Sequence, residues 1–328
     1  MDDTDRKLMI LIIANPRVHL RELARRLGIS RQAVHRRMRN LTEAGAIRGT
    51  TAGVSVPYLD AIPVVVFGRS RAGSIEDTLD RLGQNELSRR AVVAGGNFLY
   101  VVGFLRDISE LDSYAEFVKQ TAEMSEPTVG IYCSDDGLMP NYSVDGTGKR
   151  KPSYKELSPL DLRIIAALKD DARRPVADIA HKVGVSAKTV QRHLENMISE
   201  GSLDLHALVD SPSGGDMFSV MHVNLRDGAN KGEVGKRILS KHPFQDAYIR
   251  TFSNLPNLIV LVFWSGSVTE IRKVLREVGE DEDVGAVMLN IAYLERLYTT
   301  WRDELPEVRT RPSRKARTRD LHSGLGTQ

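Results

Sequence analysis

The stretch LRELARRLGISRQAVHRRM, residues 20–38, predicts two short helices joined by a tight turn. The segment from Leu20 to Leu27 carries apolar residues at helical spacing, and Gly28 ends this helix because a residue without Cβ can adopt the left-handed conformation. Ser30 is placed to cap the next helix, at about residues 31–44, by accepting a hydrogen bond from an unpaired backbone N–H. Two helices joined in this way are typical of a helix-turn-helix motif.

The same pattern returns 156 positions later in the chain. Residues 5–45 align with residues 161–201 without a gap, and Gly28 falls on Gly184. The apolar positions and the capping serine match as well. A chance match would not keep glycine, serine and apolar positions together over this length, so the chain contains an internal repeat. A further helix at about residues 5–14 completes the first unit.

A strand-rich segment follows each helix-turn-helix unit. Residues 46–51 and 53–56 predict a β-hairpin, which would form a small wing. Strand and helix patterns then follow in the order βαββαβ, over residues 62–133 and again over residues 218–291. This order is typical of a ferredoxin-like domain, a four-stranded antiparallel sheet with two helices on one face. The predicted fold class is therefore α+β, with two winged helix-turn-helix domains alternating with two ferredoxin-like domains.

The chain divides into six predicted segments. A stretch rich in Asp, Gly, Pro, Ser and Lys predicts a linker between the copies, and an Arg/Lys-rich C-terminus without apolar periodicity predicts disorder. The segments are a winged helix-turn-helix domain at 1–57, a ferredoxin-like effector and dimerisation domain at 58–136, a linker at 137–155, a second helix-turn-helix domain at 156–210, a second ferredoxin-like domain at 211–305 and a basic disordered tail at 306–328.

The charge of the chain is concentrated at its N-terminus. The 328 residues have a net charge of only +3, but residues 1–50 carry eleven Lys/Arg against five Asp/Glu, a surplus of +6. Residues 156–205 carry seven Lys/Arg against eight Asp/Glu, a net charge of −1. A compact basic segment is what polyphosphate binding requires, although a solvated surface gives the same composition.

Several classes of protein are excluded by composition. Cys133 is the single cysteine, so no disulfide or thiolate cluster can form within the chain. His181 and His193 lie twelve residues apart, which is not a zinc-ligand spacing on one helical face. The acidic start MDDTD is not a signal peptide, and the apolar runs have strand length rather than membrane length. We expect a cytoplasmic protein with no metal ion, cofactor or membrane partner.

The helix at residues 31–44 carries a stripe of polar side chains. Val34 and Leu41 recur at helical spacing and should face inward. Arginine pairs bidentately with guanine and glutamine with adenine, and N-terminal residues of a recognition helix reach deepest into the major groove. The predicted DNA contacts of the first unit are Ser30 at the cap, Arg31, Gln32 and His35 near base edges, and Arg36 and Arg39 at phosphates; Arg48 in the wing is either a phosphate or minor-groove contact or a plain surface residue.

The second unit offers a comparable but less basic helix. Its candidate DNA contacts are Ser186, Lys188, Thr189, Gln191 and Arg192. Thr189 and Gln191 are suited to read bases, and Lys188 and Arg192 to hold phosphates. Because the surrounding segment is net negative, the alternative is a helix-turn-helix unit that is kept for packing.

The motifs together resemble the leucine-responsive/asparagine regulator family, Lrp/AsnC. The resemblance is carried by DRKL at 5–8, LGIS at 27–30, EAGAIRG at 43–49, GGNFLY at 95–100 and the helix at 107–117. Members usually carry one such unit, whereas this chain has two, and the second has NLPN at 254–257 in place of the Gly-Gly-Asn turn.

The resemblance implies a sequence-specific transcriptional regulator that binds double-stranded DNA and assembles into a homodimer or a higher oligomer. It also implies paired sheets and an amino-acid-like effector bound near Gly95, Gly96 and Asn97. A plain hairpin loop whose glycines supply positive φ is the alternative for this turn. Sheets that pair within one chain would present two different recognition helices to an asymmetric site.

Two other functions compete with this interpretation. The sequence contains no nucleophile, base and acid at a spacing typical of a catalytic site, so we expect that the protein is not an enzyme. The Lrp-like sirohaem decarboxylases share the architecture, and that resemblance would require histidine and arginine near the second and third strands. Arg89, Arg90, Tyr248 and Arg250 are available there, but neither hairpin contains a histidine. A sequence-tolerant architectural DNA-binding protein is the third possibility, which the basic tail would suit.

Overall fold

The computed structural model describes residues 2–133, 156–209, 217–241 and 248–310. The predicted linker at 137–155 and most of the predicted tail lie outside these residues. Among the described residues, none of the helices is both long and apolar enough to span a bilayer.

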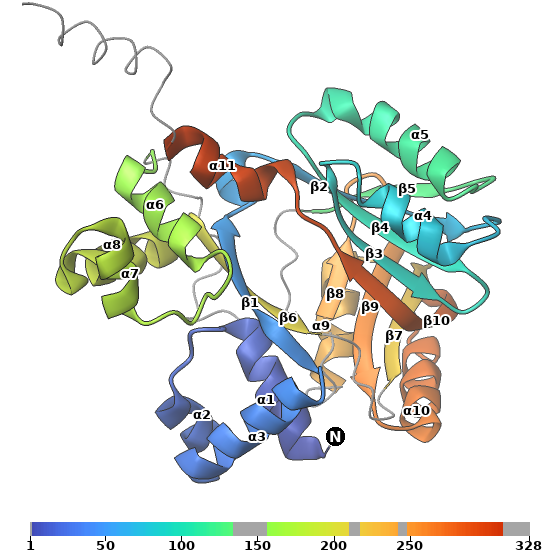
Figure 1. Ribbon diagram of the computed structural model, residues 1–328. Helices are drawn as coiled ribbons and strands as arrows, with labels where there is room; N and C mark the ends of the chain where they lie inside the picture. Colours follow the sequence, from blue (N-terminus) through green and yellow to red (C-terminus); the bar gives the residue numbers. More distant parts are fainter. Residues whose placement is uncertain (1, 134–155, 210–216, 242–247, 311–328) are drawn as a thin grey trace, which may run out of the picture.

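Both helix-turn-helix units form as predicted (Figure 1). The first consists of α1 (Asp3–Ala14), α2 (Leu20–Leu27) and α3 (Arg31–Glu43), and the second of α6 (Pro159–Leu168), α7 (Val176–Val183) and α8 (Ala187–Glu200). Gly28 has a φ of 66°, which permits the turn after α2. The Ser30 hydroxyl accepts a hydrogen bond from the Ala33 N–H at 3.1 Å, so the predicted cap is confirmed.

The predicted wing hairpin is wrong. Residues 47–54 form a single strand, β1 (Ile47–Val54), which pairs antiparallel with β6 (Leu203–Val209) of the second copy. The reason is that β1 supplies two cores: Ile47 is buried in the first helix-turn-helix unit, whereas Ala52 and Val54 are buried in the second. The two-stranded β1–β6 ribbon therefore completes both units and ties them together.

Both ferredoxin-like halves have the predicted βαββαβ order. The first contains β2 (Ile62–Arg69), α4 (Ile75–Leu82), β3 (Ser88–Ala94), β4 (Phe98–Leu105), α5 (Leu111–Thr121) and β5 (Thr128–Ile131), with short 3-10 helices η1 (Pro57–Leu59) and η2 (Ile108–Glu110) before β2 and α5. The second contains β7 (Met217–Leu225), α9 (Lys231–Lys241), β8 (Tyr248–Thr251), β9 (Leu258–Ser265), α10 (Val268–Gly279) and β10 (Val284–Leu297).

The two halves join into one sheet instead of forming separate sheets. Its strand order is β5-β2-β4-β3-β10-β7-β9-β8, with β3 pairing antiparallel with β10. The outer strands also meet, because the Cys133 N–H donates to the Thr251 carbonyl at 3.1 Å and the Ser253 N–H to the Ile131 carbonyl at 2.9 Å. The sheet thus closes on itself and leaves few unpaired edge groups.

Each half covers one face of the sheet with its own helices, α4 and α5 in the first and α9 and α10 in the second (Figure 1). The opposite faces meet in an interior core, to which both halves contribute. Aromatic side chains dominate this interior, among them Phe67, Tyr100, Phe218, Tyr248 and Phe252. The two copies within one chain therefore pair as the two subunits of a dimer would.

The last helix, α11 (Trp301–Thr310), joins the sheet to the β1–β6 ribbon. The Trp301 indole N–H donates to the Phe104 carbonyl of β4 at 2.8 Å, and Arg302 Nη1 donates to Asp204 Oδ2 of β6 at 3.0 Å. The helix includes residues 306–310, so the predicted disorder is wrong for them. The buried side chains of Arg302 and Pro306 anchor this segment.

Gly103 on β4 is packed directly against Tyr114 of α5. A Cβ at this position would lie 2.5 Å from ring atoms of Tyr114, which is 1% exposed. Gly103→Ala is therefore expected to lower the free energy of unfolding by about 1–3 kcal/mol, measured by urea denaturation. Gly95→Ala is the control, because a Cβ there would have no atom within 4 Å. Equal stability of the two variants would contradict this packing.

Candidate nucleic-acid interface

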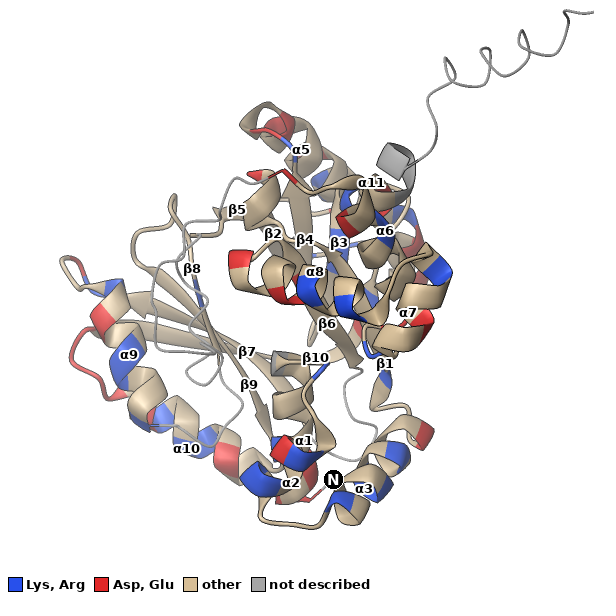
Figure 2. Cartoon of the chain, turned by 90° about the vertical axis from the view of Figure 1, so that its left-hand side faces the viewer, with Lys and Arg blue, Asp and Glu red and all other residues tan. Residues whose placement is uncertain are grey.

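The predicted contact residues of α3 all lie at the surface. Figure 2 views the side of the molecule that carries both helix-turn-helix units. Val34 and Leu41 are buried in the unit's core, as predicted. The exposed residues on and before α3 are Ser30, Arg31, Gln32, His35, Arg36 and Arg39. Arg39 is within 3.7 Å of the Glu43 carboxylate one turn later, and Arg48 is exposed on β1.

Arg37 of α3 is held by two carboxylates at the start of another helix. Its Nη1 lies 2.6 Å from Asp5 Oδ1 and 2.7 Å from Asp2 Oδ2, both at the start of α1. These contacts hold α3 against α1 and set the direction in which the exposed face points. The equivalent position of the second unit is His193, whose Nδ1 lies 2.6 Å from Asp161 Oδ1.

The exposed face of α8 is less open than that of α3. Ser186, Lys188, Gln191 and Arg192 are exposed, but Thr189 is half-buried. The hydroxyls of Ser186 and Thr189 are 2.8 Å apart, and the Gln191 amide donates to Glu195 Oε1 at 2.7 Å. The polar groups of this helix are therefore partly engaged with one another, and Glu195 adds negative charge beside them.

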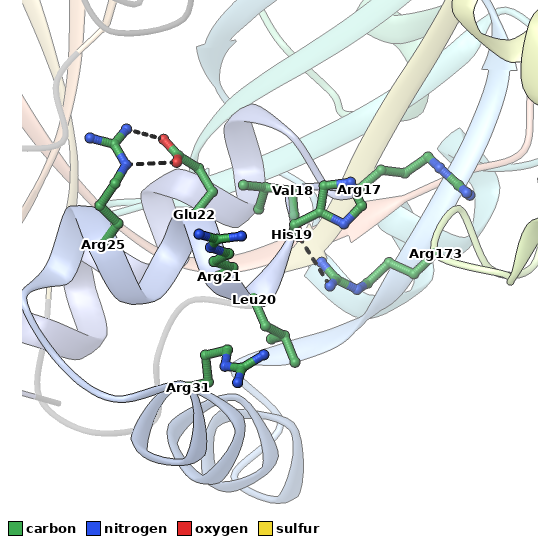
Figure 3. A pocket seen from close by; sticks show the side chains of 9 residues that line it. All are labelled: Arg17, Val18, His19, Leu20, Arg21, Glu22, Arg25, Arg31 and Arg173. Carbon is green, nitrogen blue, oxygen red and sulfur yellow. Dashed lines mark hydrogen bonds and ion pairs between the residues drawn. The ribbon is translucent and has the colours of Figure 1, made fainter.

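A basic groove of about 940 Å³ lies where the two units meet (Figure 3). The groove is defined by its basic and acidic lining residues, Arg17, His19, Arg21, Glu22, Arg25, Arg31 and Arg173. The sequence pattern does not predict this groove, because Arg17 and Arg21 lie outside the predicted recognition helix. The available signal was the repeat, which places Arg17 and Arg173 at equivalent positions.

Arg17 and Arg173 cross between the units in a reciprocal way. Arg17 Nη1 donates to the carbonyls of Ala172 and Arg174, at 2.5 and 3.1 Å. Arg173 in turn donates to the carbonyl of Pro16 and, at 3.2 Å, to that of Val18. Each arginine thus binds the carbonyls on either side of its counterpart, so a local two-fold relation holds the units side by side.

The predicted effector turn lies against the second copy. Gly95 and Gly96 are exposed, Asn97 is half-buried, and Gly96 and Asn97 have positive φ values of 69° and 54°. The Gly95 N–H donates to the Ile291 carbonyl of β10 at 3.1 Å, and Tyr293 of β10 reaches Asn97 Oδ1 at 3.5 Å. The turn is thus at a junction between the two copies.

A polar cluster that the sequence did not reveal lies inside the closed sheet. The Tyr100 hydroxyl of β4 is 2.9 Å from His222 Nε2 of β7, and the Asn290 amide of β10 donates to the same hydroxyl at 2.7 Å. The Phe67 ring lies 5.0 Å from the His222 ring. His222 is 5% exposed, and burial lowers its pKa from 6.5 to about 4, so it is neutral near pH 7.

The buried His222 makes stability depend on pH. The unfolded chain binds a proton at this histidine below pH 6.5, whereas the folded chain binds it only near pH 4. The neutral His222 therefore leaves the free energy of unfolding undiminished above pH 6.5. Below this pH the free energy of unfolding falls, by about 3 kcal/mol when the pH reaches 4. Urea denaturation should show that His222→Gln loses this part of the pH dependence. The exposed control His35→Gln should retain it, and identical profiles would contradict the assignment.

Comparisons with known proteins agree with the geometry of the two units. Residues 1–48 match a winged helix-turn-helix DNA-binding family, and residues 157–198 match the AsnC-type helix-turn-helix domain. The second unit is therefore an AsnC-type helix-turn-helix domain, and parts of the chain are similar to HTH-type transcriptional regulators. The HTH-type transcriptional regulator Ptr1 of Methanocaldococcus jannaschii is 29% identical over 116 residues, which cover 35% of this chain and 78% of that protein. LrpA of Pyrococcus horikoshii is 26% identical over 113 residues, 34% of this chain and 80% of LrpA.

Nearly the whole chain also shares its fold with one solved structure. The siroheme decarboxylase NirDL superposes with a TM-score of 0.56 at 15% sequence identity, covering 98% of this chain and 100% of that chain. At this identity the likeness concerns the fold alone.

Proposed function

We propose that this chain is a DNA-binding transcription regulator that inserts α3 into the major groove of double-stranded DNA. The observation that carries the proposal is the exposed polar face of α3, in a segment with a net charge of +6. Arg31, Gln32 and His35 would read base edges, because they lie near the N-terminal end of the helix. Arg36 and Arg39 would hold phosphates.

The second unit would make the weaker half of the same site. Lys188 and Arg192 are available for phosphates, but α8 carries fewer free polar groups. Helix-turn-helix dimers span half-sites about 34 Å apart. Because the β1–β6 ribbon joins two different recognition helices in one chain, the operator would be asymmetric. Assembly into a homodimer or a higher oligomer remains a prediction.

An amino-acid-like effector would bind beside Gly95, Gly96 and Asn97. The turn is exposed, and β10 of the second copy lies next to it, so a ligand there would touch both copies. Such a ligand would change the populations of arrangements that differ in the placement of the recognition helices. The proposal rests on the family resemblance together with this position.

A second candidate function is catalysis inside the closed sheet. The Tyr100–His222–Asn290 cluster favours it, since the fold is shared with a siroheme decarboxylase. The surrounding side chains pack closely, however, and the exposed face of α3 would have no role in decarboxylation. We therefore favour the regulator without catalytic activity. Turnover of sirohaem, followed by its absorbance, would reverse this choice.

DNase I footprinting tests the regulator proposal. We expect a protected site in at least one promoter, with the upstream region of the protein's own gene included among the probes. Arg36→Ala/Arg39→Ala should lose the protection, because two phosphate contacts are removed. No protection on any promoter would contradict sequence-specific regulation, and uniform protection of all DNA would indicate an architectural protein.

A further inference from the structure

The basic groove has more positive charge than its surroundings neutralise. Its single carboxylate, Glu22, is already paired with Arg25 and Arg26, at 2.6 and 2.7 Å. Among the described residues, no carboxylate lies within ion-pair distance of the four other arginines, Arg17, Arg21, Arg31 and Arg173. A groove that gathers four guanidinium groups without an ion-paired carboxylate is suited to an anion with several charges.

Two of these arginines lose hydration, and the carboxylate that acts on both of them, Asp171, is not within ion-pair distance of either. Arg17 and Arg173 are half-buried where the units meet, and their nearest acceptors are backbone carbonyls. Burial lowers the pKa of both guanidinium groups, although they stay protonated near pH 7. An anion in the groove would offset this unfavourable desolvation.

The groove is more basic on the side of the first unit, although Val18 in its lining has Arg174 as its equivalent in the second unit. The positions of the second unit that are equivalent to Arg21, Arg25 and Arg31 are Ala177, His181 and Ala187. The equivalent of His19 is Pro175. The repeat has therefore kept the arginines that join the units, Arg17 and Arg173, whereas Arg21, Arg25 and Arg31 are arginines in the first unit alone.

We propose that the basic groove binds the sugar-phosphate backbone of one DNA strand between the two recognition helices. This inference rests on the proposed function and adds Arg21 and Arg173 to the DNA-binding surface. Arg31 lies at the start of α3 and lines the groove, so the strand would run from α3 toward the second unit. Arginine forks match phosphate oxygens, and the contacts would act on any sequence.

The test is the salt dependence of DNA binding by Arg21→Ala, measured by fluorescence anisotropy with operator and scrambled duplexes. Loss of one phosphate contact should reduce the slope of log K against log salt by about 0.9 and weaken both duplexes alike. The ratio of the two affinities should stay the same. Arg21→Lys should keep the slope, because it keeps the charge. Arg272→Ala, an exposed arginine on α10, is the matched control and should behave as the wild type.

The outcomes separate this inference from the proposed function. An unchanged slope in Arg21→Ala would overturn the groove as a phosphate site while the wild type still binds DNA. A loss of operator preference at a constant slope would also overturn it, because Arg21 would then read bases. No binding by the wild-type chain would overturn the proposed function itself, and the groove's role in DNA binding with it.

Discussion

Replacing Gln32 and His35 by alanine is expected to reduce the preference for operator over scrambled DNA about 100-fold. Both side chains are exposed on the first two turns of α3, where a recognition helix lies closest to base edges. Each good base contact contributes about 1–3 kcal/mol of discrimination, so two contacts account for a change of this size. Competition anisotropy with both duplexes measures the ratio directly.

The matched control is the equivalent pair of the second unit, Lys188→Ala/Gln191→Ala. The Gln191 amide is engaged with Glu195, so this variant should lose less of the preference. Circular dichroism should show that both variants retain the helical content of the wild type. If the Gln32→Ala/His35→Ala chain kept the full preference for operator, α3 would not be the helix that reads the sequence.

The second large effect is expected at Arg302, which joins α11 to the β1–β6 ribbon. The side chain is 1% exposed, donates to Asp204 at 3.0 Å and lies 5.1 Å from the centre of the Phe104 ring. Removing one partner of a buried ion pair leaves the other without compensation, so Arg302→Ala should cost about 3 kcal/mol of unfolding free energy. The expected loss of unfolding free energy is small for a buried ion pair, because Asp204 is partly exposed and also contacts His206.

Urea denaturation of three variants separates charge from packing at this position. Arg302→Met keeps most of the side-chain volume but not the charge, so its loss should fall between the wild type and Arg302→Ala. Arg296→Ala removes an exposed arginine on β10 and should leave the transition unchanged. A transition of Arg302→Ala that coincides with the wild type would mean that α11 does not hold the ribbon.

Features that depend on neighbouring residues in sequence were predictable. Gly28 and Ser30 determine a turn and a cap over a few residues, and helical spacing distinguishes the buried Val34 from the exposed Gln32. The βαββαβ order follows from alternating patterns of the same kind. Because the chain repeats, the same predictions apply to the equivalent residues of the second copy.

Contacts between the two copies were not predictable from these patterns. The residue pattern of β1 does not predict that this strand pairs with β6, its own equivalent in the second copy, 156 positions later in the chain. The same holds for Tyr100 and His222, which meet only because the halves pair face to face. Arg17 and Arg173 could be matched through the repeat, but their exchange of carbonyl contacts depends on the way the units dock.

The two copies differ in charge on the surface proposed to face DNA. The Gly and Ser of the turn are kept, whereas Arg21, Arg25 and Arg31 have uncharged or weakly basic equivalents in the second unit. Arg37, which contacts Asp5, is replaced by His193, which contacts Asp161. This division agrees with one unit that carries most of the DNA affinity and a second that positions it.

The central claim is tested most directly by the affinity of the wild-type chain for promoter and scrambled DNA at several salt concentrations. Fluorescence anisotropy should give tight, salt-dependent binding that favours particular promoters, and Arg31→Ala/Gln32→Ala should reduce it to the level of scrambled DNA. An absence of binding near physiological salt, or binding that does not distinguish the sequences, would contradict a regulator that reads DNA with α3.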